Sequence, residues 1–540
     1  MRRLSAPVAI CLACATVATP QGRPVDWPSY GGDARRSGWE KSDYRITKDN
    51  VKDFQLVLKR KFDKEPGGPY ALSAPVVIGL LISYKGFKEL GFVAGNSGNL
   101  WAIDVDTNRL FWNKDLDGPG SKAKASGTCP GGMTATPALT PPVIFGARRT
   151  PAPAKPASPS PGLPPTPAGR STALPARIGG SGFGAPRPVY ALTSDGKLHQ
   201  LNTSNGTDQF PPLDFLPANA NASSLTMDDH VMYTTTSGNC GGVQNGVWAL
   251  DLAIEEPKTA SFPLKGGEPS GPGGFAVGND GTVYVQTGPG EMDAASGKFS
   301  NTLLALSAKD LKLQHYFTSP ATAAKNASHL NAVTPVVFEF KGRDLIASAG
   351  PDGRLYLLDS KSLGGEDHKT SLSQTSPVSS ANGGIWGGLS TWEDSNGTRW
   401  IAAPVWGAVN PELKAPVTNG AAPNGSIVAF KVEEQNGKPA LTPVWVSRDM
   451  NSPEPPVLTS GMVFALSTGG YTAQSGTLRP RSSSHATLYA LDGETGKEMY
   501  STGNQVTAPG SLTGLTIVNG RVYFTTTDST LYAFGIFLEI

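Results

Sequence analysis

Charged residues are scarce in this chain, and long apolar stretches with a helical period are missing. Only 17% of the 540 residues are charged, and 46 basic residues are nearly balanced by 44 acidic ones. The basic residues are scattered along the chain rather than clustered. The resulting field gives no reason to expect nucleic acid or an anionic membrane as a partner.

Cysteine is also rare, with four in the chain. Cys11 and Cys14 lie in an N-terminal segment that begins MRR, continues with the apolar stretch APVAICLACA and ends in small residues. This pattern predicts a secretory signal peptide over residues 1–22, with a disordered leader as the alternative and lipidation at Cys14 left open. We therefore expect a periplasmic or secreted protein. No other segment is suited to cross a membrane.

The two remaining cysteines are Cys129 and Cys240. In an exported protein such a pair is a candidate disulfide, and two separate buried thiols are the alternative that the sequence leaves open. The chain contains no Cys-x-x-Cys-His motif for haem attachment. Any electrons leaving this protein would therefore pass to a separate carrier.

Glycine and proline are abundant, with 64 and 46 residues, and short runs of β-branched and aromatic residues lie between turn residues. Such runs predict an all-β chain. One run recurs eight times, each copy predicting a strand with alternating faces, and most copies follow an earlier strand across a tight turn. The copies are GNLWAID (98–104), GKLHQLN (196–202), NGVWALD (245–251), NTLLALS (301–307), GRLYLLD (353–359), GSIVAFK (425–431), ATLYALD (486–492) and STLYAFG (529–535).

The widest gap between copies contains a stretch rich in proline, alanine and serine, residues 148–180. Such a composition cannot build a packed core, so it predicts an exposed, disordered loop inserted among the repeats. A role as a spacer or adhesive arm remains open.

A longer phrase around two copies resembles the tryptophan-docking motif of PQQ-type β-propellers, the quinoprotein alcohol dehydrogenase-like family. That motif runs Ala-x-Asp-x-x-Thr-Gly-Lys-x-x-Trp. AIDVDTNRLFW (102–112) has Asn-Arg in place of Gly-Lys, and ALDGETGKEMY (490–500) ends on tyrosine. The resemblance implies that four residues have structural roles in docking neighbouring blades and no chemical role. They are Asp104, Trp112, Asp492 and Tyr500.

The opening of the mature chain, residues 26–58, is also similar to the opening of this family, with Leu58 where a docking tryptophan is usual. The last copy ends five residues before the C-terminus, so we expect the N-terminal segment to complete the last blade. The resemblance implies an all-β fold: one eight-bladed β-propeller over residues 23–540, built of four-stranded antiparallel blades and closed by pairing of N- and C-terminal segments. We expect a monomer.

A working dehydrogenase of this family holds PQQ at the propeller axis with Ca²⁺ or a lanthanide and uses an aspartate as general base. At the expected metal-ligand positions this chain has Asn239 and the stretch Gly288–Gly290, which offers no side-chain oxygen. No acid occurs between Asp310 and Glu339, where the general base is expected. A neutral asparagine cannot act as a base near pH 7, and a desolvated dication needs carboxylates. We therefore predict no catalytic residue and no metal ligand.

Trp386 is the one candidate cofactor-binding residue, because its ring, in a glycine-flanked turn, could stack on a planar cofactor or a sugar. The alternative is that Trp386 lines the central channel without a partner. Glu291 or Asp293, just beyond the turn at Gly288–Gly290, remains open as a displaced metal ligand.

Two functions follow from these observations. The first is a non-catalytic PQQ-like propeller that binds a protein or glycan partner through its top-face loops. The alternative is a periplasmic PQQ-dependent quinoprotein dehydrogenase that oxidises alcohols, sugars or polymeric alcohols. The missing axial acids favour the first function, and the enzyme-like opening segment favours the second. PQQ with Ca²⁺ or a lanthanide belongs to the second function only; under the first, the cofactor is unknown.

Overall fold

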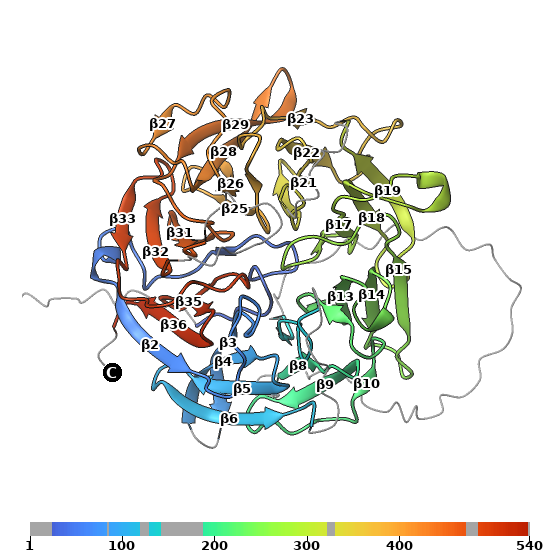
Figure 1. Ribbon diagram of the computed structural model, residues 1–540, viewed down its shortest axis with the longest axis vertical. Coiled ribbons are helices and arrows are strands. Elements are labelled where there is room, and N and C mark those ends of the chain that lie inside the picture. Colours follow the sequence, from blue (N-terminus) through green and yellow to red (C-terminus); the bar gives the residue numbers. More distant parts are fainter. Residues whose placement is uncertain are drawn as a thin grey trace, which may run out of the picture.

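The computed structural model describes most of the chain, and the predicted signal peptide (1–22) and proline-rich loop (148–180) lie outside the described residues. The described residues are 24–83, 86–118, 129–141, 187–320, 330–470 and 484–537. They form eight small β-sheets arranged in a ring around a central axis (Figure 1).

The first four blades follow one another along the chain. Blade 1 contains β3 (Val76–Ser83), β4 (Gly86–Ala94), β5 (Asn99–Asp104) and β6 (Arg109–Asp115). Blade 2 contains β7 (Ala138–Leu139), β8 (Pro188–Leu192), β9 (Lys197–Asn202) and β10 (Leu213–Asp214). Blade 3 contains β11 (Asn221–Ala222), β12 (Thr226–Asp228), β13 (Val231–Ser237), β14 (Gly246–Asp251) and β15 (Thr259–Pro263). Blade 4 contains β16 (Ala276–Val277), β17 (Val283–Gln286), β18 (Thr302–Leu306) and β19 (Leu313–Thr318).

Blades 5 to 8 complete the ring. Blade 5 contains β20 (Val336–Phe340), β21 (Arg343–Ala349), β22 (Leu355–Asp359) and β23 (Ser373–Gln374). Blade 6 contains β24 (Gly384–Ile385), β25 (Ser390–Glu393), β26 (Arg399–Trp406), β27 (Val417–Thr418), β28 (Gly425–Gln435) and β29 (Lys438–Val446). Blade 7 contains β30 (Val457–Thr459), β31 (Met462–Ser467), β32 (Thr487–Asp492) and β33 (Glu498–Ser501), with β1 (Trp39–Glu40) added in parallel to β30. Blade 8 contains β34 (Thr516–Val518), β35 (Arg521–Thr526), β36 (Thr530–Gly535) and β2 (Gln55–Lys61). Three short 3₁₀ helices complete the described elements: η1 (Val51–Asp53), η2 (Cys240–Gly242) and η3 (Ala294–Ser296).

The predicted eight-bladed fold is confirmed, including the closure of the ring. Each of the eight repeated phrases forms the third strand of a blade. In blade 8 the fourth strand is β2, which comes from the N-terminal segment and pairs antiparallel with β36, placing Leu58 opposite Ala533. Closing the ring in this way leaves no exposed sheet edge between the two ends of the chain.

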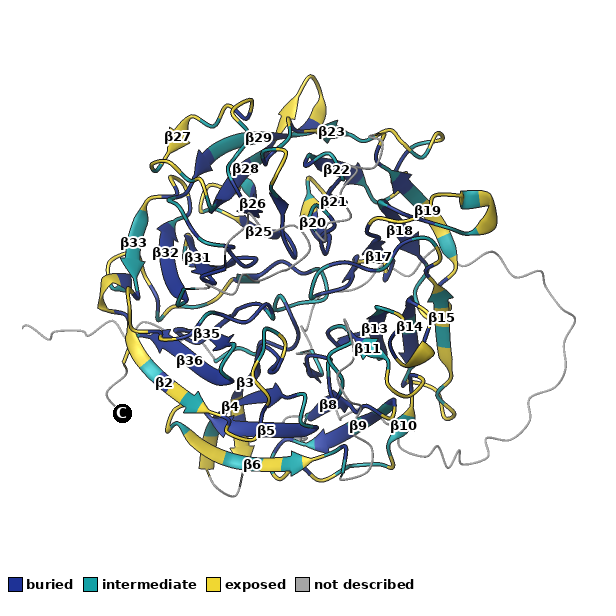
Figure 2. Ribbon diagram, in the orientation of Figure 1, coloured by how far each residue is buried: buried dark blue, intermediate teal, exposed yellow. Residues whose placement is uncertain are grey.

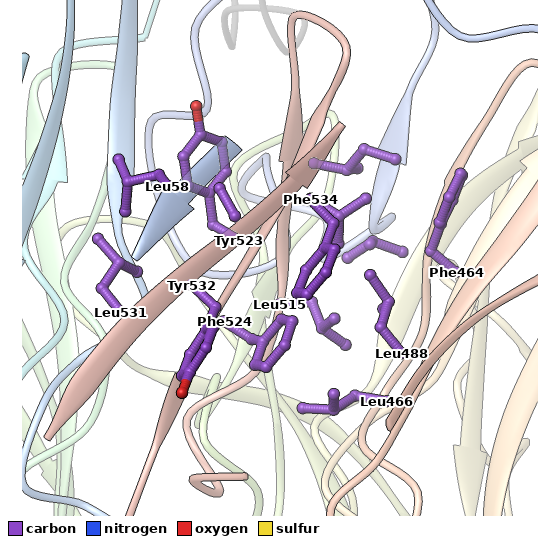
Figure 3. Packing of buried hydrophobic residues seen from close by; sticks show 14 of the residues in the cluster. Leu58, Phe464, Leu466, Leu488, Leu515, Tyr523, Phe524, Leu531, Tyr532 and Phe534 are labelled. Atoms are coloured by element: carbon purple, nitrogen blue, oxygen red, sulfur yellow. The ribbon is translucent and has the colours of Figure 1, made fainter. Parts of the chain in front are cut away.

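The third strands are buried on both faces, although their sequences predicted alternation between a buried and an exposed face. All six residues of β5 and of β36 are buried. The reason is that each blade stacks face to face on both of its neighbours, so both faces of a central strand lose contact with water. Figure 2 shows buried third strands and exposed outer strands such as β2 and β6. Figure 3 shows the junction of blades 7 and 8, where Leu466 and Leu488 meet Leu515 and Phe534.

The antiparallel blades give the propeller two distinct ends. Connections between strands two and three of a blade, and between one blade and the next, lie at what we call the upper end. Connections between strands one and two, and between strands three and four, lie at the lower end. The docking turns, which join strands three and four, therefore belong to the lower end.

The docking residues tie neighbouring blades together at this lower end. The Trp112 ring nitrogen of blade 1 donates to the Thr203 carbonyl of blade 2 at 2.9 Å. The ring also covers Gly206, where a Cβ would lie 2.8 Å from it, so only glycine allows this approach. Asp104 accepts the Thr107 amide, and Asp492 accepts the Thr495 amide and hydroxyl. Each aspartate thus caps its own turn.

Tyr500 packs edge-on against Phe54, just after η1, with ring centroids 5.6 Å apart, so it docks blade 7 onto the N-terminal segment. Sequence reasoning missed a further docking residue, Trp445 on β29. Its ring nitrogen donates to the Gly493 carbonyl at 3.0 Å, and its ring lies over Gly496 of the 490–500 phrase.

The N-terminal segment from residue 24 to residue 46, which we call the N-terminal strap, crosses the axis (Figure 1). Its backbone hydrogen-bonds in turn to the first strands of six blades. The pairs are Trp27–Val77, Pro28–Leu139, Ala34–Val277, Arg35–Val337, Ser37–Thr391 and Gly38–Leu458. The strap therefore joins the inner edges of the blades, in addition to supplying the path to β2.

Candidate functional site

The axis of the propeller, where enzymes of the resembling family hold their cofactor, contains a buried cluster of polar and aromatic side chains. Three connecting segments, the last residue of β26 and the strap supply it. We call it the axial cluster, and its members are Tyr30, Arg36, Trp386, Trp406, Glu454 and Leu512.

Arg36 is the centre of the strap's contribution, and only 3% of it is exposed. Its guanidinium donates to the Phe275 carbonyl at 2.7 Å, the Tyr30 carbonyl at 2.6 Å, the Gly273 carbonyl at 2.9 Å and the Ser224 hydroxyl at 3.0 Å. Burial lowers the pKa of Arg36 to about 10, so the group stays protonated near pH 7. Its donors hold the strap to blades 3 and 4 rather than facing open space.

Glu454 is fully buried in the connection from blade 6 to blade 7. One carboxylate oxygen accepts the Trp386 ring N–H at 3.0 Å, and the other accepts the Gly514 amide at 3.1 Å. Charge-assisted bonds of this kind are among the stronger ones in proteins. The carboxylate therefore joins three connections around the axis, and both of its oxygens have donors from the chain itself.

Trp386 packs inside this cluster rather than facing an open slot. It is 5% exposed and stacks on Trp406, with ring centroids 4.5 Å apart and planes inclined by 23°. The Trp406 ring nitrogen in turn donates to the Pro453 carbonyl at 2.9 Å. One face of the Trp386 ring and its N–H are thus used by neighbouring residues of the same chain.

Tyr30 reaches the cluster from the strap. Its ring lies so close to Gly514 that a Cβ there would be 2.5 Å from a ring carbon. Its buried hydroxyl has no hydrogen-bond partner among the described residues. Burial, together with the negative charge of Glu454, raises the pKa of Tyr30, so the phenol stays neutral at any physiological pH.

Between the strap and the inner strands lies a cavity of about 20 Å³. Tyr30, Arg36, Thr334 and Ser390 supply polar groups to its wall, and Pro455 and Leu515 supply apolar ones. That volume is enough for roughly one water molecule. A tricyclic quinone is many times larger.

The residues at the expected metal-ligand positions have other partners. Asn239 is exposed and exchanges hydrogen bonds with Asn245 across its own loop. The acid-free stretch between Asp310 and Glu339 contains two asparagines. The side-chain oxygen of Asn331 accepts the Ile385 amide at 2.9 Å, and Asn326 lies outside the described residues.

The two displaced-ligand candidates are also engaged. Glu291 is exposed and pairs with Lys298 at 2.8 Å. Asp293 accepts the Ser296 hydroxyl, and Ser296 belongs to η3 in the same loop. Neither acid is brought to the axial cluster.

Other acids near the upper end hold loops together. Glu65 accepts the Ser97 amide at 3.0 Å, Asp117 the Ser194 amide at 2.8 Å, and Glu268 the Gly238 amide at 2.9 Å. Burial raises the pKa of Asp117. Each acid joins a blade-to-blade connection to a turn between strands two and three. Within the described ranges, no three His, Cys, Asp or Glu residues are grouped so that they could hold a metal ion.

Cys129 and Cys240 are joined by a disulfide, with Cα atoms 5.6 Å apart. Cys129 lies in the connection from blade 1 to blade 2, and Cys240 lies in η2 of blade 3, beside Asn239. The bond therefore braces the upper end across blade 2, next to a position where a metal ligand was expected. In the part of the chain that the structure describes, no helix is long and apolar enough to cross a bilayer.

Three solved dehydrogenase structures have a similar eight-bladed fold. The quinohemoprotein alcohol dehydrogenase ADHIIG of Pseudomonas putida HK5 aligns over 96% of this chain and 81% of its own, at 13% identity and a TM-score of 0.56. The quinohemoprotein alcohol dehydrogenase of Comamonas testosteroni aligns over 95% of this chain and 81% of its own, at 13% identity and a TM-score of 0.54. A europium-containing methanol dehydrogenase aligns over 94% of this chain and 89% of its own, at 12% identity and a TM-score of 0.52.

Neither a protein-family model nor a curated protein matches the sequence. At 12–13% identity, the likeness to these dehydrogenases concerns the eight-bladed fold. The described axial residues do not fit PQQ with a dication: no three possible metal ligands are grouped among the described residues, and the N–H and one face of the Trp386 ring are used by Glu454 and Trp406.

Proposed function

We propose that this chain is an exported, non-catalytic PQQ-like propeller that binds a protein or glycan partner through the loops of its upper end. The observation that carries the proposal is the axial cluster. Glu454, Trp386 and Trp406 bond and stack with one another and with Gly514. A site built for a quinone would instead direct such groups into an open slot.

The upper-end loops are the part of the fold that can vary without disturbing the blades. They connect rigid strands, and binding residues concentrate on such loops. The connection between β17 and β18 exposes Glu291, Met292 and Asp293 together. An acid pair around an exposed methionine offers both polar and apolar contacts to a partner.

A binding assay on immobilised protein tests this proposal. Panels of oligosaccharides and of candidate envelope proteins would be compared on the wild-type chain and on a variant with Glu291→Ala and Met292→Ala. Exposed loop positions leave the blades intact, so the fold is expected to persist. Saturable binding that the variant weakens supports an upper-end site, whereas binding left unchanged by the variant places the partner elsewhere.

The dehydrogenase remains a second candidate, because the opening segment is enzyme-like and the three dehydrogenases aligned above have a similar eight-bladed fold. Dye-linked oxidation of a panel of alcohols and sugars, after incubation with PQQ and Ca²⁺ or a lanthanide, separates the two candidates. We expect no turnover above that of PQQ alone. Turnover that scales with protein concentration would establish the enzyme and overturn the binding proposal.

A further inference from the structure

Exposed apolar side chains gather at the lower end of the propeller. Among the described residues, eleven large hydrophobic side chains are exposed, and eight of them lie at this end. These eight are Tyr44, Leu56, Leu80, Ile82, Phe87, Leu110, Ile254 and Phe537. Three of them, Leu80, Ile82 and Phe87, lie on one hairpin, and such a local group indicates an interaction surface, whereas single exposed apolar residues do not.

The hairpin formed by β3 and β4 is the most exposed part of this surface. Ile82 and Phe87 are cross-strand partners, and they are 64% and 71% exposed. Leu80, on the same hairpin, is 42% exposed. The third strand, β5, pairs with β4 only from Leu90 onward. The hairpin therefore extends beyond its blade as a two-stranded projection.

The other side of the hairpin is fixed to the blade. Leu81 is buried, and the Lys88 ammonium pairs with the Asp104 carboxylate at 2.7 Å. At the hairpin base, the Asp26 carboxylate accepts the Gly79 amide at 3.0 Å. The projection is thus anchored to a docking aspartate and to the N-terminal strap, and its apolar side chains point away from both.

The shape and composition of the projection favour a lipid surface as its occupant. Its three exposed apolar side chains stand on two extended strands, and the stretch from Gly79 to Lys88 contains no carboxylate. A stable protein interface buries roughly 800 Å² per partner from some 20–30 residues, far more than three side chains supply. Insertion into lipid needs only a few apolar groups, because each buried methylene contributes by itself.

We propose that the lower end docks on a lipid bilayer through the β3–β4 hairpin. This goes beyond the proposed function and does not depend on it. The contact is apolar, in keeping with the scattered charges of the chain. Docking by this end turns the upper-end loops away from the lipid, toward a partner in the aqueous phase.

Vesicle flotation tests the proposal with the purified chain and vesicles of phosphatidylcholine and phosphatidylethanolamine. The hairpin variant carries Ile82→Ser and Phe87→Ser. The matched control carries Tyr70→Ser and Val417→Ser, which remove two exposed apolar side chains from the upper end. We expect wild type and control to float equally, and the hairpin variant to lose at least about tenfold in partitioning. Binding should persist when salt is raised from about 0.1 to about 0.5 M.

Several results would overturn the proposal. These are failure of the wild-type chain to float, equal loss in the hairpin variant and the control, or loss of binding at high salt. Self-association of the wild-type chain that the hairpin variant abolishes would assign the hairpin to a second copy instead. A Phe87→Trp variant supplies a second readout: its added fluorescence should be quenched by brominated lipid, and an unquenched signal would contradict insertion.

Discussion

The two ends of the propeller use buried carboxylates in different ways. At the upper end, Glu454 and Glu65 accept N–H groups of neighbouring connections. At the lower end, Glu89 faces Arg521 at 3.3 Å, and Asp104 pairs with Lys88 at 2.7 Å. Carboxylates therefore hold turns and connections at both ends, and at the lower end buried ones also pair with cations.

This difference bears on function. The amide and indole donors on the two Glu454 oxygens hold this carboxylate between the connections, so it acts as a structural link at the axis. The upper end has the eight-bladed framework, and its acids hold connections in place. Ion pairs and the N-terminal strap hold the lower end together, and the hairpin of β3 and β4 is exposed there.

The largest effect is expected from the one covalent brace at the upper end. Cys129→Ser with Cys240→Ser removes a cross-link between residues 111 apart in sequence. The loop-entropy relation predicts a loss of roughly 4–5 kcal/mol in the free energy of unfolding. Urea denaturation of the oxidised protein and of the variant measures it. Equal midpoints would show that the disulfide does not brace the fold.

The second-largest loss of stability is expected when the carboxylate of Glu454 is removed. Glu454→Ala leaves two buried N–H donors without an acceptor, at a cost of about 2–5 kcal/mol in all. Trp386→Phe, which keeps an aromatic ring and removes one donor, should cost less, because Glu454 retains the Gly514 amide. Chemical denaturation compares the two. A loss with Trp386→Phe as large as with Glu454→Ala would show that stacking, rather than the carboxylate, organises the axis.

The lower end should respond to pH through Glu89. Burial raises the pKa of Glu89 from 4.5 to about 7, against the opposing effect of Arg521. Its protonated form therefore adds stability that is fully present below pH 4.5 and is lost as pH rises through about 7. The change amounts to something on the order of 3 kcal/mol.

Glu89→Gln should flatten this part of the stability profile between pH 4.5 and about 7. Denaturant midpoints of the wild type and the variant across this range provide the measurement. Parallel pH profiles of the two proteins would contradict the assignment to Glu89.

The smallest effect is expected at the ion pair between Lys48, just before η1, and Asp492 of blade 7. Lys48 donates to Asp492 at 2.7 Å, and the lysine side chain is 40% exposed. Lys48→Ala should cost only about 0.2–1 kcal/mol and less at high salt. Thermal denaturation at two salt concentrations measures the difference. A cost several times larger, unchanged by salt, would show that the packing of this segment on blade 7 depends on the pair.

Much of the fold could be predicted from the sequence because the repeated phrases are local. Each phrase combines a strand with the turn that ends it, so eight copies indicate eight blades. The similarity of residues 26–58 to the N-terminal segment of PQQ-type propellers predicted that this segment completes the last blade and closes the ring. Trp445 escaped notice because its own phrase lacks the Asp-x-x-Thr turn, and its partner turn begins at Gly493, 48 residues later.

The axial cluster could not be predicted in the same way. Glu454 lies in the sequence NSPEPP, which has the composition of an exposed turn. Its partners, Trp386 and Gly514, are 68 and 60 residues away. Such a cluster arises only when connections from different blades converge on the axis. Trp386 was singled out from its flanking glycines, but its stacking on Trp406 depends on how β24 and β26 pair.

Titration of the purified chain with PQQ, in the presence of Ca²⁺ or a lanthanide, tests most directly whether the axis is filled by the protein itself. Tryptophan fluorescence and calorimetry would follow binding, because two tryptophans lie in the axial cluster. Because Glu454 already accepts the Trp386 N–H and the Gly514 amide, we expect no saturable binding of PQQ. Stoichiometric binding with quenching of tryptophan fluorescence would contradict that prediction, because the axial cluster would then have to open to admit the cofactor.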